Sequence, residues 1–164
     1  GAASDFYGDD KKHSKSHHQQ YSDFIRGGMY KNAVQLLTCA SCHDPHQRTN
    51  PRQLRADPTN NAALCGGSCH PGPASSVKDH VDAKLGAGMG NLMKTAKCAQ
   101  CHMPKTAKTG AGRPGLLAGT TQYWQNDVSS HFFDVPAKAL AQTTGQNMPM
   151  GYTDACGAIC HSAP

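Results

Sequence analysis

Cys39-Ala-Ser-Cys42-His43, Cys65-Gly-Gly-Ser-Cys69-His70, Cys98-Ala-Gln-Cys101-His102 and Cys156-Gly-Ala-Ile-Cys160-His161 are four stretches with one arrangement of residues. Together they use all eight cysteines, and a histidine directly follows each second cysteine. Histidine makes up 10 of the 164 residues, so chance would give four such histidines in only about one sequence in 10^5 of this composition. The repeated pattern is therefore not a coincidence.

Two thiols followed by an imidazole are the groups that attach a c-type haem. The thiols add to the two vinyl groups of the haem, and the imidazole binds the iron. The sequence therefore predicts four covalently attached haem c groups. The thioether cysteines are Cys39, Cys42, Cys65, Cys69, Cys98, Cys101, Cys156 and Cys160, and the proximal iron ligands are His43, His70, His102 and His161.

Two of the four motifs have three residues between the cysteines instead of two. Gly66, Gly67 and Gly157 lie in these longer spacers, and glycine allows an extra residue to bulge without strain. Disulfides and zinc are the alternatives, since eight cysteines can form a disulfide framework and two close pairs can bind zinc. Neither explains why the same small motif occurs four times.

The composition is poor in large apolar groups: 37% of the residues are hydrophobic and 6% aromatic, and there are 17 glycines and 10 prolines. Such a chain buries too little apolar surface to offset its own ordering entropy. We expect the haems to supply the missing interior. The predicted fold is mostly irregular, with short α-helices wrapped around four closely packed haems and little or no β-sheet, in a single domain over residues 1–164 with a polar arm at 1–16.

The charge and the hydropathy of the chain limit its partners. The net charge of +5 is offset by haem propionates, which lysine and arginine bind, so we expect no nucleic-acid partner. No run of apolar residues is long enough to span a membrane, and no signal peptide opens the sequence. Because haem is attached to such motifs outside the cytoplasm, we expect an exported protein whose mature chain starts at Gly1.

Between the motifs, the sequence predicts short helices at 17–26 and 30–37, separated by Gly27-Gly28. A break at Pro71-Gly72-Pro73 precedes a helix at 75–85 capped by Ser75 or Ser76. Further helices are expected at 91–95 and 136–142. Residues 103–121 show no apolar periodicity and are expected to form an exposed loop or a flap.

Six histidines remain for the four distal iron positions: His13, His17, His18, His46, His80 and His131. We expect His17 or His18 of the polar arm to turn inward; the alternatives are a disordered tail and a surface copper or nickel site. His46 lies too close to His43 to bind the opposite face of the same haem, and it therefore points to a different haem or is a noncoordinating surface histidine. His131 is flanked by Phe132 and Phe133 and is either a ligand or a core histidine.

With imidazoles in surplus, every iron is predicted to be six-coordinate, although methionines are possible ligands. Iron with both axial positions filled has no open site for substrate, so we expect electron transfer and not catalysis. The alternatives are a soluble periplasmic tetrahaem shuttle, a multihaem reductase with one five-coordinate haem, and a subunit of a larger electron-transfer complex.

Two blocks carry a family resemblance: Cys39-Ala-Ser-Cys42-His43-Asp44-Pro45-His46, and Ser130-His131-Phe132-Phe133-Asp134-Val135-Pro136. Together with the size, the haem number and the histidine-bearing arm, they resemble the extracellular multihaem cytochromes that polymerise into filaments. The resemblance implies an extracellular or cell-surface homopolymer that exchanges electrons with redox donors and acceptors. It also implies that His46 ligates the haem at Cys156 and Cys160 of the adjacent subunit.

Overall fold

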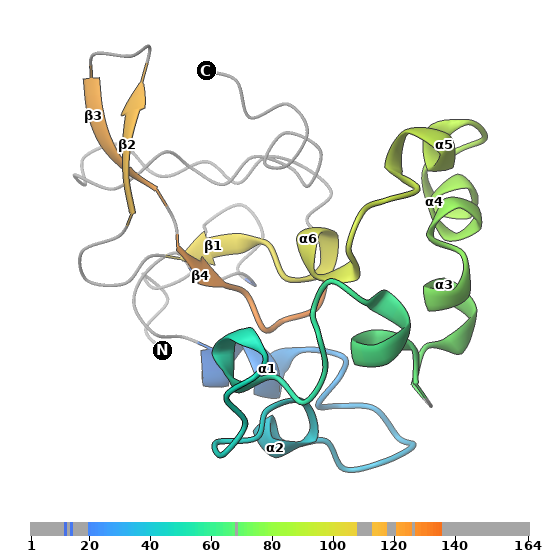
Figure 1. Cartoon of the computed structure of the whole chain (residues 1–164), viewed down its shortest axis with the longest axis horizontal. Helices are drawn as coiled ribbons and strands as arrows, with labels where there is room; N and C mark the ends of the chain where they lie inside the picture. Colours follow the sequence, from blue (N-terminus) through green and yellow to red (C-terminus); the bar gives the residue numbers. More distant parts are fainter. Residues whose placement is uncertain are drawn as a thin grey trace. The chain divides into compact units, whose positions relative to one another are not determined.

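The computed structural model describes residues 12, 14, 20–67, 69–107, 113–117, 121–125 and 127–135. In these residues the chain is mostly irregular, with short helices and two small two-stranded sheets (Figure 1). The prediction of a mostly irregular chain with short helices and little β-sheet is confirmed. The chain divides into two compact units, Leu36–Gln100 and Gly1–Gln35 with Cys101–Pro164. The prediction of a single domain stays a prediction, as does that of a polar arm at 1–16.

The unit Leu36–Gln100 is built from short helical segments. They are α2 (Cys39–Cys42), η2 (Pro51–Gln53), η3 (Ala62–Gly66), α3 (Pro71–Ser75), α4 (Val77–Leu85), α5 (Met89–Met93) and the start of α6 (Cys98–His102). Ser76 caps α4 as predicted, because its side chain accepts a hydrogen bond from the Asp79 N–H. Asp82 then accepts a hydrogen bond from the Gly90 N–H at 2.7 Å, which fastens α5 to α4.

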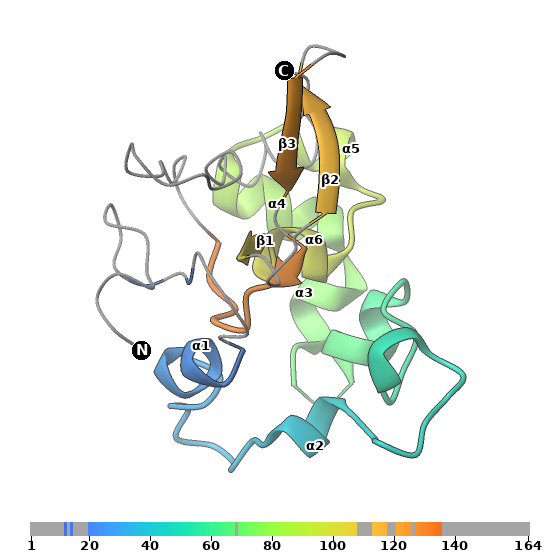
Figure 2. The ribbon, with the colours of Figure 1, turned by 90° about the vertical axis from the view of Figure 1, so that its left-hand side faces the viewer.

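The other unit contains α1 (Gln20–Arg26), the end of α6 and the strands. Strand β1 (Lys105–Ala107) pairs antiparallel with β4 (Val128–Ser129), with Lys105 opposite Ser129. Strands β2 (Arg113–Leu117) and β3 (Thr121–Gln125) form a hairpin with Gly115 opposite Tyr123 (Figure 2). Residues 103–121 are therefore not simply an exposed loop: Thr106 and Ala107 are buried. Their partner strand lies far along the chain, so local periodicity does not reveal it.

Two other local predictions are wrong. Residues 30–37 form no helix, because the Asn32 side chain accepts hydrogen bonds from the backbone N–H groups of Val34 and Gln35, both at 2.9 Å. Such local bonding competes with helical hydrogen bonds. Pro71-Gly72-Pro73 does not break the chain but begins α3, since proline is well tolerated in the first helical turn.

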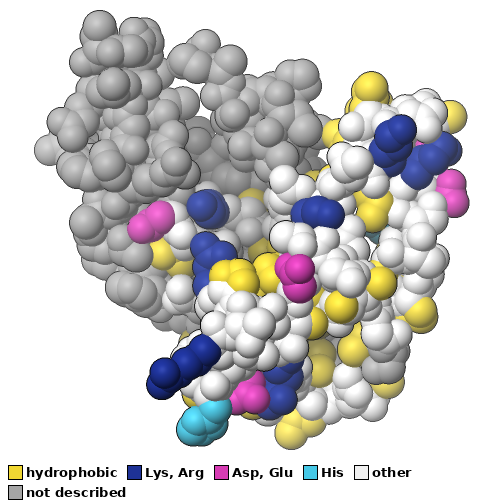
Figure 3. Space-filling view, viewed as in Figure 1, with side chains coloured by type: hydrophobic (Ala, Val, Ile, Leu, Met, Phe, Trp, Pro, Cys, Tyr) yellow, Lys and Arg dark blue, Asp and Glu magenta, His cyan; other side chains and the backbone are white. Residues whose placement is uncertain are grey.

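The described residues bury very few apolar side chains. Ala107 and Val128 are the buried hydrophobic residues among them, whereas Val34 and Leu36 are 91% and 81% exposed. Hydrophobic side chains also reach the surface at many places in Figure 3. The low apolar content of the sequence thus corresponds to a small protein core. None of the described helices combines the length and apolar character that crossing a membrane requires.

Candidate haem-binding site

Two of the cysteine motifs form short helices that begin in the same way. At α2, the Thr38 backbone N–H donates a hydrogen bond to Ser41 Oγ at 3.0 Å. At α6, the Lys97 N–H donates to Gln100 Oε1 at 2.6 Å. In both motifs, the side chain of the residue before the second cysteine therefore accepts a hydrogen bond from the backbone N–H of the residue that precedes the helix, as in a capping box. Because residues three apart lie on one helix face, the two cysteines of each motif lie on the same side.

The second motif has the longer spacer and a different backbone. Cys65 lies in η3, a π-helical turn, and Gly67 follows with a φ of 31°. The Gly67 N–H closes the turn on the Ala62 carbonyl at 2.8 Å, and the His70 N–H donates to the Gly66 carbonyl at 2.9 Å. A left-handed φ suits glycine, so the structure supports the prediction that a glycine absorbs the extra residue.

The thiols of different motifs lie close enough to affect one another. Burial, followed by the charge of the Cys98 thiol and a hydrogen bond with it, raises the pKa of the Cys65 thiol to about 11. Burial likewise raises the pKa of Cys42, with contributions from Cys69 and Cys39. These thiols are therefore protonated at neutral pH.

Asn61 connects the second motif to the third. Its side chain donates a hydrogen bond to the Ala96 carbonyl at 3.0 Å and accepts one from the Cys98 N–H at 2.9 Å. The Cys98 amide is at the start of α6, where backbone donors have no partner within the helix. Asn61 satisfies this donor and holds the beginning of α6 next to η3.

His43 is oriented by a backbone carbonyl. Its Nδ1 is 2.9 Å from the Arg52 carbonyl oxygen, and because a carbonyl only accepts, Nδ1 carries the proton. The lone pair of the neutral ring is then on Nε2, the nitrogen that would bind iron. The backbone is fixed here by hydrogen bonds from the Asp44 N–H to the Gln53 carbonyl at 2.8 Å and from the Arg55 N–H to the Cys42 carbonyl at 2.9 Å.

His102 has the same kind of partner. Its Nδ1 is 3.3 Å from the Phe133 carbonyl oxygen. Phe133 has a φ of 62° and Arg52 a φ of 57°, a conformation that is uncommon outside glycine. Both carbonyls that orient predicted proximal histidines therefore belong to residues in an unusual backbone conformation, which often marks a functional site.

His131, outside every cysteine motif, repeats this arrangement. Its Nδ1 is 3.1 Å from the Ser129 carbonyl oxygen, which again places the lone pair on Nε2. The imidazole is partly buried and packs edge-on against the Phe133 ring, with 5.9 Å between the ring centroids. The ring is therefore oriented as metal-binding histidines usually are, by a hydrogen bond from the other nitrogen.

The other predicted site residues have different surroundings or lie outside the description. His46 and His70 are exposed, and His80 is partly buried on α4. His13, His17, His18, Cys156, Cys160 and His161 lie outside the described residues, as does the expected helix at 136–142. Their predicted roles stay predictions.

The groups present fit a covalently bound haem better than the alternatives. Cys39, Cys42, Cys65 and Cys98 are not joined in disulfides, so these four cysteines give no support to a disulfide framework. The described residues also contain no group of three or more His, Cys, Asp or Glu side chains arranged to hold a metal ion. The zinc alternative therefore gains no support. Paired thiols beside an imidazole with an oriented Nε2 match the needs of c-type haem.

Sequence reasoning missed the contacts that three residues make with the predicted ligands. Arg52 and Phe133 act through backbone carbonyls, which no side-chain pattern reveals. Asp23 of α1 is buried and accepts a hydrogen bond from the His131 N–H at 3.3 Å. Its only sequence signal is an acidic residue in a short amphipathic segment, which usually indicates a solvated helix face.

Comparison with known proteins gives one match. Residues 32–75, which contain the first two cysteine motifs, match the profile of a family described as a doubled CXXCH motif. Searches of curated proteins and of solved structures gave no significant match. The motifs indicate covalently bound c-type haem, and the match supports a multihaem c-type cytochrome.

Proposed function

We propose that this protein is a tetrahaem c-type cytochrome that transfers electrons as a subunit of an extracellular filament. The observation that carries the haem assignment is the repeated orientation of imidazoles by backbone carbonyls, at His43 and His102 inside the motifs and at His131 outside them. When bound, c-type haem supplies a one-electron redox centre. The four cysteine motifs give the proposed number of haems.

Electron transfer is favoured over catalysis by the histidine supply. Six histidines outside the motifs are available for four distal positions, and the structure orients one of them, His131, like a ligand. Iron ligated on both faces leaves no position for substrate. The purified holoprotein should therefore give optical and electron paramagnetic resonance spectra of low-spin haem only, whereas a stoichiometric high-spin haem would favour a reductase.

The filament proposal depends on His46. This histidine is exposed, and its backbone N–H donates to Asp44 Oδ1 at 3.0 Å, which shapes the turn that follows α2. An exposed imidazole on an ordered turn is suited to ligate a haem of a neighbouring subunit. We propose that it binds the iron of the haem at Cys156 and Cys160 in the next copy.

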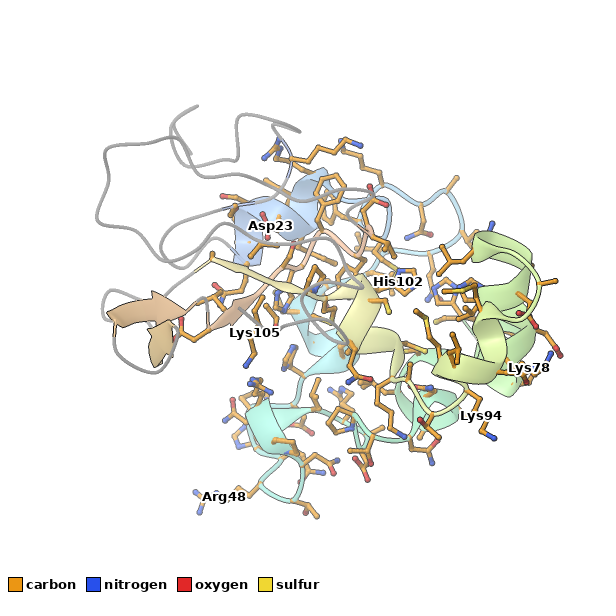
Figure 4. The ribbon with its side chains drawn as sticks, turned by 90° about the horizontal axis from the view of Figure 1, so that it is seen from above. Asp23, Arg48, Lys78, Lys94, His102 and Lys105 are labelled. Carbon is orange, nitrogen blue, oxygen red and sulfur yellow. The ribbon has the colours of Figure 1, made fainter. Side chains whose placement is uncertain are left out.

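The test is to replace His46 with Ala and to compare polymer length by electron microscopy. The variant should keep all its haems, as measured by intact mass, but assemble poorly, and the haem that lost its ligand should become high-spin. Arg48→Ala is the matched control, because Arg48 is an exposed neighbour that extends away from the ribbon (Figure 4). Normal filaments from the His46 variant would refute the inter-subunit ligand, and a monomeric wild-type protein would indicate a soluble shuttle.

A further inference from the structure

Segment 130–133 is anchored to a buried carboxylate. Asp23, on α1 (Figure 4), is only 2% exposed. Its Oδ1 accepts a hydrogen bond from Ser14 Oγ at 2.5 Å, and its Oδ2 accepts one from Ser130 Oγ at 2.9 Å and one from the His131 N–H at 3.3 Å. A buried carboxylate with several donors is costly to disrupt, so Asp23 holds this segment in place.

Other contacts fix the same four residues. The Ser130 N–H donates to the Pro104 carbonyl at 2.8 Å, and the Phe132 N–H donates to Ser130 Oγ at 3.2 Å. A Cβ at Gly27 would lie 2.6 Å from the Phe132 carbonyl oxygen, so α1 ends directly against the segment. These contacts make it unlike a loop that rearranges freely when a ligand binds.

Two imidazoles depend on this segment in different ways. His131 belongs to it, and His102 is bound through the Phe133 carbonyl oxygen at 3.3 Å. Phe133, whose carbonyl oxygen makes this contact, has a left-handed backbone conformation with a φ of 62°. The segment therefore controls one predicted distal ligand and one predicted proximal ligand.

These two histidines are too closely tethered to bind one iron from opposite faces. Two histidines that bind one iron lie on opposite sides of the porphyrin. The atom that accepts a hydrogen bond from Nδ1 of the first histidine is then about 12 Å or more from the Cα of the second histidine. Since each residue of extended chain spans at most about 3.6 Å, the Phe133 carbonyl oxygen is within about 10 Å of the His131 Cα. The hydrogen bond between His102 Nδ1 and the Phe133 carbonyl oxygen therefore excludes binding of His102 and His131 to opposite faces of the same iron.

We propose that His131 ligates the iron of a haem other than the one attached at Cys98 and Cys101, and that segment 130–133 is a peptide link between two neighbouring haems. This inference rests on the proposed function, because it takes His102 and His131 as iron ligands. It assigns the two haems to adjacent positions in the electron path. Asp23 is a positioning residue for both.

The first experiment is His131→Ala in the full-length holoprotein. Loss of the ligand should convert one haem equivalent to high-spin iron in the electron paramagnetic resonance spectrum, and added imidazole should restore the low-spin signal. A spectrum unchanged from wild type would show that His131 is not a ligand, which overturns the ligand set of the proposed function. That result differs from one in which His131 is a ligand but binds the same haem as His102.

The pairing is tested by placing His131→Ala in a chain with Cys98→Ser and Cys101→Ser, whose intact mass should be one haem lower. If His131 binds a different haem, one equivalent of high-spin iron should appear in this chain as well. If His131→Ala has its effect only when the haem at Cys98 and Cys101 is present, both histidines bind that haem and the link is refuted. If the double-serine chain misfolds, an experimental structure of the wild-type holoprotein decides, since the iron at His131 Nε2 must not be the one at His102 Nε2.

Discussion

Asp23 joins three parts of the chain through one side chain. It accepts hydrogen bonds from Ser14, Ser130 and His131 while almost completely buried. A group with this many buried donors acts on stability and on ligand geometry together, because removal leaves each donor without an acceptor. The same side chain therefore links the N-terminal region to a predicted iron ligand.

Asp23→Ala should lower the free energy of unfolding of the holoprotein by about 2 to 4 kcal/mol, since several buried donors lose their acceptor. It should also produce a high-spin fraction that imidazole reverses, which a purely structural residue would not. Denaturant unfolding and electron paramagnetic resonance measure the two effects.

Asp134→Ala is the control for Asp23→Ala. Asp134 is a nearby acidic residue that is exposed and pairs with Lys12 at 3.7 Å, and exposed pairs contribute at most about 1 kcal/mol. Equal effects of the two substitutions would contradict the positioning role of Asp23.

Helices α4 and α5 are held together by one carboxylate. Asp82 accepts hydrogen bonds from Lys78 Nζ at 2.8 Å and from the Gly90 N–H at 2.7 Å. The bond from Lys78 and then that from Gly90 lower the pKa of Asp82 below its ordinary value of 3.8. The same partner, through its hydrogen bond and charge, raises the pKa of Lys78 above 10.5.

The pairing of α4 with α5 should therefore depend on pH in a defined direction. Because the folded pKa of Asp82 is lowered, its contribution is complete above the ordinary aspartate pKa and is lost as the pH falls through the folded value. The contribution of Lys78 is lost only in strong base. Protection of the Gly90 amide from exchange, relative to its intrinsic rate at each pH, should fall in acid. Asp82→Asn should remove this pH dependence whereas Asp134→Asn should not, and its persistence in Asp82→Asn would contradict the assignment.

Asn61 has a comparable role at the junction of η3 and α6. Asn61→Ala removes hydrogen bonds to the Ala96 carbonyl and from the Cys98 N–H and should cost about 1 to 2 kcal/mol. Hydrogen exchange should show faster exchange of the Cys98 amide, while Asn91→Ala, at an exposed residue of α5, should leave it unchanged. Undiminished protection of Cys98 in the Asn61 variant would argue against the cap.

Local signals in the sequence predict the local part of this structure. The cap at Ser76 and the glycine that accommodates the longer spacer depend on residues within a few positions of one another, and the structure has them. The helices at Cys39–Cys42 and Cys98–His102 were not predicted from the sequence. The segment 30–37 is predicted wrongly because the hydrogen bonds of one side chain, Asn32, outweigh helix propensity. The pairing of β1 with β4 and the hydrogen bonds of Asp23 join residues that are far apart in sequence. The periodicity of the sequence does not predict such contacts.

The part of the chain that the structure describes has little apolar interior of its own. Ala107 and Val128 are the buried hydrophobic side chains of the described residues, and such a chain has little to offset its ordering entropy. Covalently attached haems would supply that interior. The sequence alone predicts this requirement from composition, and the small number of buried apolar side chains among the described residues is consistent with it.

The most direct measurement is the intact mass of the protein purified from its native host, taken with its visible spectrum. We expect the mass of the 17.4 kDa polypeptide plus four haem masses that persist under denaturing conditions, and an intense Soret band. A mass equal to that of the bare polypeptide, in a colourless preparation, would contradict the central claim that the paired thiols carry haem.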